Sequence, residues 1–141
     1  MKIDLAQVNW AAVAAAGVAA FMLGGLWYSA LFGKLWIRLQ GWNEQKVAEM
    51  KARMSPAKFL GGMVVAYTVL AFTVSLLVVV VGVRGPVEGA CLGSILWLGP
   101  AAAIGFTGYL ASDRRFGGFA LDAAFQLVAL LTQGIILASW R

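Results

Sequence analysis

Four long runs of uncharged, apolar residues constrain the fold of this chain more than any other feature of its sequence. A helix of about 20 residues crosses the roughly 30 Å hydrocarbon core of a bilayer, and a helix satisfies its own backbone hydrogen bonds there. At 62% hydrophobic and 12% charged residues, the 141-residue chain has more apolar surface than one soluble core could bury. We therefore expect an all-α fold, a polytopic integral membrane four-helix bundle that forms a single domain over residues 1–141. The predicted spans cover approximately residues 8–33, 57–83, 87–111 and 119–140.

Several classes of chemistry lack their usual residues. The chain has no histidine, and its only cysteine, Cys91, has no second cysteine to pair with. Zinc and haem ligation by the usual residues, histidine acid–base catalysis and Cys/His nucleophiles are therefore excluded. The acidic residues lie in loops or near helix ends, and no nucleophile has an evident partner. We expect no catalytic residue, cofactor or metal site, and a protein that is not an enzyme.

The net charge of +5 is explained better by membrane orientation than by nucleic-acid binding. Eight basic residues lie between spans one and two or between spans three and four, whereas only Lys2, Arg84 and Arg141 lie on the opposite side. The positive-inside rule then places both termini on the outer face of a bacterial inner membrane. Lys2 and the terminal amine work against this orientation. Membrane lipids are the expected partners, and nucleic acid is not.

The only long polar segment contains a predicted amphipathic helix at residues 43–54, in the cytoplasm. Asn43 can cap it, and Val47, Met50 and Met54 fall on one side of it. The cations Lys46, Lys51 and Arg53 are available to the polar side. Such a helix would lie at the interface with an anionic leaflet. A solvated helical hairpin is the alternative.

Small residues recur at every fourth position of the first span, at Ala12, Ala16, Ala20 and Gly24. This pattern allows a second helix to approach closely. We expect the stripe to hold part of a homo-oligomer contact, with packing inside one bundle as the alternative. In the third span, Pro100 predicts a kink that serves packing or a gate.

The passages "GGLWYSALFGKLW", "SILWLGP" and "FQLVALLTQGIILASW", spaced over four spans, carry a family resemblance. Together they resemble a family of small bacterial membrane proteins catalogued as domain of unknown function 1761. The resemblance covers nearly the whole chain. It implies a four-helix membrane fold and assigns no activity or catalytic residue.

Aromatic residues at the end of the first span have two readings. Trp27, Tyr28 and Trp36 straddle the predicted cytoplasmic boundary, where amphipathic rings prefer to lie. Alternatively, Gly24, Gly25 and Gly33 bring backbone close to these rings and leave a slot for a lipid chain or headgroup. Trp27 and Tyr28 are then the first candidate ligand contacts.

Polar residues of the fourth span form the second candidate site. Asp122, Gln126 and Gln133 lie within about 40° of one another on a regular helix, so we expect all three to face the bundle interior. Asp122 either stabilises the start of its helix and pairs with Arg114 or Arg115, or contacts a cationic solute, a proton or a lipid headgroup. For the glutamines, the alternative to ligand contact is hydrogen bonding between helices.

These features favour binding or transport of a lipid or small solute by a homo-oligomer. The alternative is an accessory or structural subunit that packs against a larger membrane protein complex. The chain is similar to small proton-coupled multidrug exporters in size alone. Those proteins rely on a glutamate in the first span, and no charged residue lies between Asp4 and Lys34 here.

Overall fold

The computed structural model describes residues 4–113 and 115–141, and over these residues it is helical with no strand. The predicted all-α fold is confirmed. In chain order the elements are the 3₁₀ turn η1 (Leu5–Gln7), α1 (Trp10–Leu26), the π-helical η2 (Trp27–Leu31), α2 (Gly33–Leu39), α3 (Glu44–Arg53), α4 (Pro56–Val81), α5 (Gly85–Leu96), the π-helical η3 (Trp97–Ala103), α6 (Ile104–Leu110) and α7 (Phe116–Ser139).

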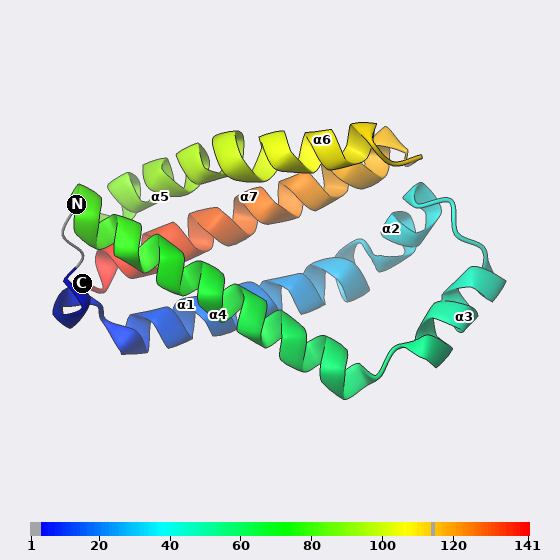
Figure 1. Cartoon of the computed structure of the whole chain (residues 1–141), viewed down its shortest axis with the longest axis horizontal. Helices are drawn as coiled ribbons and strands as arrows, with labels where there is room; N and C mark the ends of the chain where they lie inside the picture. Colours follow the sequence, from blue (N-terminus) through cyan, green and yellow to red (C-terminus); the bar gives the residue numbers. More distant parts are fainter. Residues whose placement is uncertain (1–3, 114) are drawn as a thin grey trace.

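Four continuous helices are long and apolar enough to cross a membrane, judged by length and composition. They are Trp10–Leu31, Pro56–Val81, Gly85–Leu110 and Phe116–Ser139. Neighbouring spans run in opposite directions, so that both termini lie at one end of the bundle and α3 lies at the other (Figure 1). The architecture is that of a multi-pass membrane protein.

Local sequence explains where the helices begin and turn. The side chains of Asn9, Asn43 and Ser55 accept hydrogen bonds from the first-turn amides of α1, α3 and α4, respectively. Between α4 and α5 the chain passes through Gly82 and Gly85, whose φ angles of 81° and 77° favour glycine.

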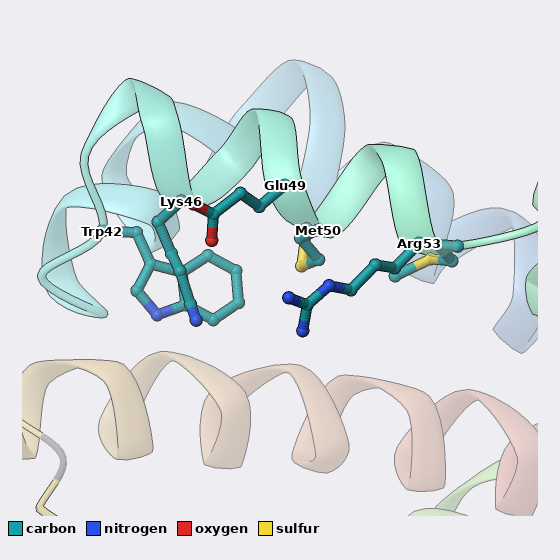
Figure 2. Close-up of a pocket in the computed structure, with 6 residues that line it drawn as sticks. Trp42, Lys46, Glu49, Met50 and Arg53 are labelled. Carbon is teal, nitrogen blue, oxygen red and sulfur yellow. The ribbon is translucent and has the colours of Figure 1, made fainter.

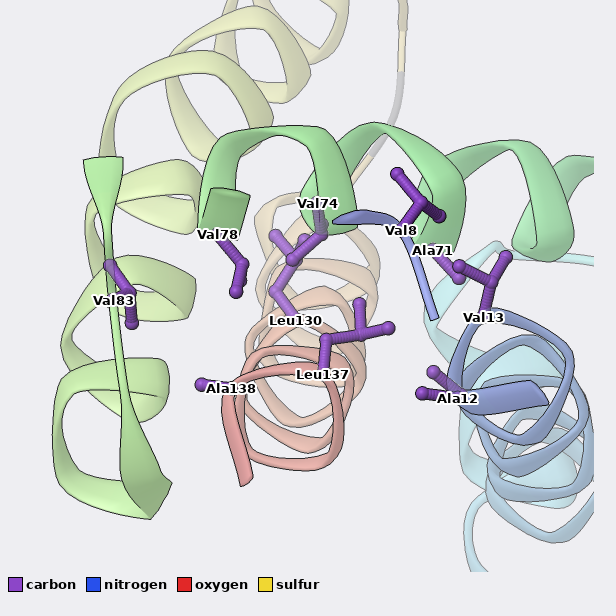
Figure 3. Packing of buried hydrophobic residues seen from close by; sticks show 11 residues of the cluster. Val8, Ala12, Val13, Ala71, Val74, Val78, Val83, Leu130, Leu137 and Ala138 are labelled. Carbon is purple, nitrogen blue, oxygen red and sulfur yellow. The ribbon is translucent and has the colours of Figure 1, made fainter. Parts of the chain in front are cut away.

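The main hydrophobic core lies toward the end of the bundle that holds the termini. Side chains of α1, α4 and α7 meet there, as the close-up of the cluster shows (Figure 3). Its buried members are Val8, Ala12, Val13, Ala16, Ala71, Val74, Val78, Val83, Leu130, Leu137 and Ala138.

The small-residue stripe of α1 lies inside this bundle. Ala16 and Ala20 are fully buried within one chain, and Ala12 and Gly24 are buried as well. The expectation that the stripe joins two copies is therefore wrong, and the alternative of packing inside one bundle is correct. The reason is that α1 needs close approach to α4 and α7, and a Cβ at Gly17 would lie 3.1 Å from the Cα of Thr68.

Helix α5 packs on α7 through glycine. Gly89 and Gly93 are the buried residues of α5, and they lie directly against the backbone of Gly134 and Leu130 in α7. A Cβ at Gly93 would lie 2.5 Å from the carbonyl oxygen of Leu130, so the two backbones touch. Beyond this contact, the span continues through η3, which contains Pro100. The predicted irregularity at this proline is a π-helical segment.

Helix α4 packs along only part of its length. Its C-terminal half contributes Ala71, Val74, Ser75 and Val78 to the interior, whereas residues 56–62 are all exposed. Figure 1 shows the N-terminal half of α4 diverging from α1 and α7 toward α3. The bundle is therefore tight at the end with the termini and open at the end with α3.

Candidate functional site

The candidate site is built around Asp122, in the second turn of α7 at the open end of the bundle. Its side chain is half-buried, and its Oδ1 accepts two hydrogen bonds. The Tyr28 hydroxyl donates across 2.8 Å and the Trp36 Nε1–H across 2.9 Å. Hydrogen bonds to a charged acceptor are stronger than those between neutral groups. The end of the first span and α2 therefore together hold the carboxylate of the fourth span.

The π-helical turn in the first span brings these two donors together. In η2 the amide of Phe32 donates to the carbonyl oxygen of Trp27, and the chain then breaks at Phe32, whose φ is −126°. A Cβ at Gly33 would lie 2.8 Å from the Tyr28 carbonyl oxygen, so only glycine fits. The indole of Trp36 then packs edge-on against the Tyr28 ring, at 5.8 Å between centroids.

Aromatic rings surround this carboxylate on the bundle side. Phe125, one turn along α7, contacts the rings of Trp27, Tyr28 and Tyr67 at centroid distances of 6.0, 5.2 and 6.0 Å. A Cβ at Gly24 would lie 3.3 Å from Phe125 and 3.4 Å from the Tyr67 hydroxyl. The protein's own rings therefore fill the space beside Gly24.

The other two glycines of that prediction have different surroundings. Gly33 lies against the backbone of Tyr28, and a Cβ at Gly25 would have no described atom of another element within 4 Å. Trp27 contributes its ring to the aromatic cluster, and its buried Nε1–H has no hydrogen-bond partner among the described residues. Of the two aromatic candidates, Tyr28 is the one that donates a hydrogen bond to Asp122.

The prediction that three polar residues of α7 face the interior holds for Gln133. Its side chain is fully buried, and its Nε2 donates to the Tyr67 carbonyl oxygen at 3.1 Å. The Gln133 Oε1 atom is buried with no partner among the described residues. Gln133 therefore joins α7 to α4, which is the structural role considered for it.

For Gln126 the same prediction is wrong, because its side chain is exposed. Gln126 lies two turns nearer the open end than Gln133, where α4 has diverged from α7 (Figure 1). The helix wheel places both glutamines on one side of α7, but only the deeper one has a neighbouring helix to cover it. Within residues 4–113 and 115–141, the side-chain amide of Gln126 forms no hydrogen bond.

Of the two arginines predicted to pair with Asp122, only Arg115 is among the described residues. Arg115 directs its guanidinium to the carbonyl oxygen of Arg38, at 3.5 Å, and lies beside Gly41. Arg114 lies outside the described residues. Across the described part of the chain, no three His, Cys, Asp or Glu side chains are grouped closely enough to hold a metal ion.

Sequence reasoning missed Trp36 as a contact of Asp122. Trp36 lies eight positions after Tyr28, and a regular helix would place them about 80° apart. The signals for their meeting were the Phe32–Gly33 break and the two donor side chains that flank it.

The comparisons with known proteins identify a family and add no activity. No curated protein and no solved structure matches the chain. One family model matches residues 11–138, nearly the whole chain. The chain therefore belongs to the family described as "Protein of unknown function (DUF1761)".

Proposed function

We propose that this protein binds a small solute or lipid at Asp122 and acts in its binding or transport, without enzymatic chemistry. One observation carries the proposal: a half-buried carboxylate within an apolar span is held by the Tyr28 hydroxyl of the first span and the Trp36 indole of α2. Ionisable residues inside membrane spans are costly and commonly mark ligand or ion paths. The ligand class that suits this site carries an ammonium or hydroxyl donor beside an apolar body.

The shape of the bundle supports ligand access to Asp122 from one end of the bundle. The tight core lies near the termini, and the Asp122 site lies at the end where α4 leaves the bundle. Basic residues concentrate in the segments at that end, so we place it in the cytoplasm of a bacterial cell, with both termini outside. A solute or headgroup would then reach Asp122 from the cytoplasmic leaflet.

Native mass spectrometry in mild detergent tests the proposal, with Asp122→Asn as the variant and Asp113→Asn as a matched control. Both substitutions remove one carboxylate, but Asp113 lies exposed in the turn before α7. We expect Asp122→Asn to lose a retained small molecule that the native protein and Asp113→Asn keep. An Asp122→Asn protein that retains the same molecules and only melts earlier would contradict the proposal.

Membership of a larger assembly is the second candidate function. Gln126 favours it, because an exposed amide in the middle of an apolar span is unfavourable against lipid unless a partner or water covers it. Copies of the chain are the partner we propose first, and a stoichiometric foreign subunit in the native spectrum would favour the accessory role instead.

A further inference from the structure

A pocket lies on the polar segment that joins the first two spans, outside the Asp122 site. It has a volume of about 360 Å³ and is lined by Trp42, Lys46, Glu49, Met50, Arg53 and Met54. Figure 2 shows the labelled side chains of Trp42, Lys46, Met50 and Arg53 projecting to the same side of α3.

The spacing along α3 explains this mixture of charge and apolar surface. Lys46, Met50 and Arg53 stand at i, i+4 and i+7, so they share one face of the helix. The sequence-based expectation placed Lys46 and Arg53 on a polar side apart from the methionines, and that separation is wrong. Lys46 and Arg53 lie before and after Met50 along this face, so the pocket lining combines charged ends with apolar side chains.

The pocket carries an excess of one positive charge. Within residues 4–113 and 115–141 neither Lys46 nor Arg53 forms an ion pair. Glu49, the only acidic residue of the lining, accepts a hydrogen bond from the Gln45 amide at 3.3 Å. Two cations and one carboxylate complement a phosphodiester, which carries a single negative charge.

The position of the pocket suits the headgroup layer of a membrane. Helix α3 lies between the end of the first span and the start of α4, and Trp42 packs edge-on against Trp36 at 5.1 Å between ring centroids. Tryptophan and basic residues are enriched at this level of a bilayer. Beside α3, the N-terminal half of α4 exposes Phe59, Leu60 and Val64, which offer apolar surface to acyl chains.

We propose that this pocket binds the headgroup of an anionic glycerophospholipid, with Lys46 and Arg53 holding the phosphodiester. Trp42, Met50 and Met54 contact the glycerol and the upper acyl chains, and Glu49 faces the polar end of the headgroup. This proposal rests on the lining of α3 and is independent of the proposed role of Asp122.

To test this proposal, the whole chain is reconstituted in nanodiscs that contain equal parts of phosphatidylglycerol and phosphatidylcholine. Native mass spectrometry then measures the ratio of the two lipids that the protein retains. The variant is Lys46→Gln with Arg53→Gln. The matched control, Lys51→Gln with Lys58→Gln, removes the same charge from the same segment but outside the pocket lining. Because Lys46 and Arg53 would each donate charge-assisted hydrogen bonds to the phosphodiester, whereas the control cations attract the leaflet only diffusely, the pocket variant should lower the retained ratio by roughly tenfold relative to the control.

The outcomes distinguish a specific lipid-binding site from general electrostatic attraction of anionic lipid. A large loss in the pocket variant, with a ratio in the control close to that of the native protein, supports the proposal. Equal losses in both variants, or none in the pocket variant, overturn it. Displacement of the retained lipid by millimolar inorganic phosphate would also overturn it, because the ligand would then be a soluble anion. Retained lipid in Asp122→Asn distinguishes this site from the one at Asp122.

Discussion

Replacing Gly134 by alanine tests the idea that direct backbone contact holds α5 to α7. A Cβ at residue 134 would meet the carbonyl oxygen of Gly89 far inside contact distance and would lie 3.1 Å from the Gly89 carbonyl carbon. Both atoms belong to the backbone, so no side chain can rotate away to make room. The helices must therefore separate at Gly89 and Gly93, which are the buried residues of α5.

The size of the effect follows from two opposing terms. Overpacking a closely packed contact costs about 1–3 kcal/mol, and a backbone clash belongs at the upper end of that range. Alanine is more favourable than glycine within a helix by about 1 kcal/mol, which offsets part of that cost. We therefore expect Gly134→Ala to lower the free energy of unfolding by about 2 kcal/mol.

Gly61→Ala is the matched control, because a Cβ at Gly61 has nothing within 4 Å. It keeps the gain in helix propensity without the clash, so it should leave stability unchanged or raise it by up to about 1 kcal/mol. Reversible unfolding of both variants in mixed detergent, followed by circular dichroism, measures the difference. Equal stability of the two variants would refute the argument that the α5–α7 contact depends on glycine.

Two further predictions concern the first span and the orientation. Ala16→Leu should destabilise the monomer by about 1–3 kcal/mol, because its methyl group is fully buried, whereas Ala14→Leu on the exposed side of α1 should have little effect. Equal melting temperatures would show that the stripe is not packed inside the chain. In a Cys91→Ala background, a cysteine replacing Trp140 should react with an impermeant maleimide in intact cells, and a cysteine replacing Gln45 should not. Labelling of residue 45 from outside would reverse the proposed orientation.

The elements of this fold were predictable because each depends on nearby residues. Four apolar runs of membrane-crossing length predict four long helices whatever their packing partners are. The caps at Asn43 and Ser55 and the turn at Gly82 similarly follow from local side chains and backbone freedom. None of these features requires knowledge of which helix lies beside which.

The site was less predictable because it depends on distant packing. Asp122, Gln126 and Gln133 share one sector of α7, yet only Gln133 is fully buried, since α4 covers that depth and diverges below it. A helix wheel contains no information on such divergence. The contact of Trp36 with Asp122 likewise depends on the π-helical turn, which changes the angular register after Tyr28.

The two π-helical segments explain why the site lies where it does. Each begins at a tryptophan that follows a leucine, Trp27 in η2 and Trp97 in η3. From η2, Tyr28 donates to Asp122, while the Nε1–H of Trp97 in η3 donates to the carbonyl oxygen of Ala123 at 2.7 Å. Adjacent residues of α7 are therefore held by both odd-numbered spans, each at its irregular turn. Because π-helical turns leave the regular backbone pattern and recur at functional sites, their convergence on one turn of α7 gives a structural reason, independent of charge, to look for function at Asp122.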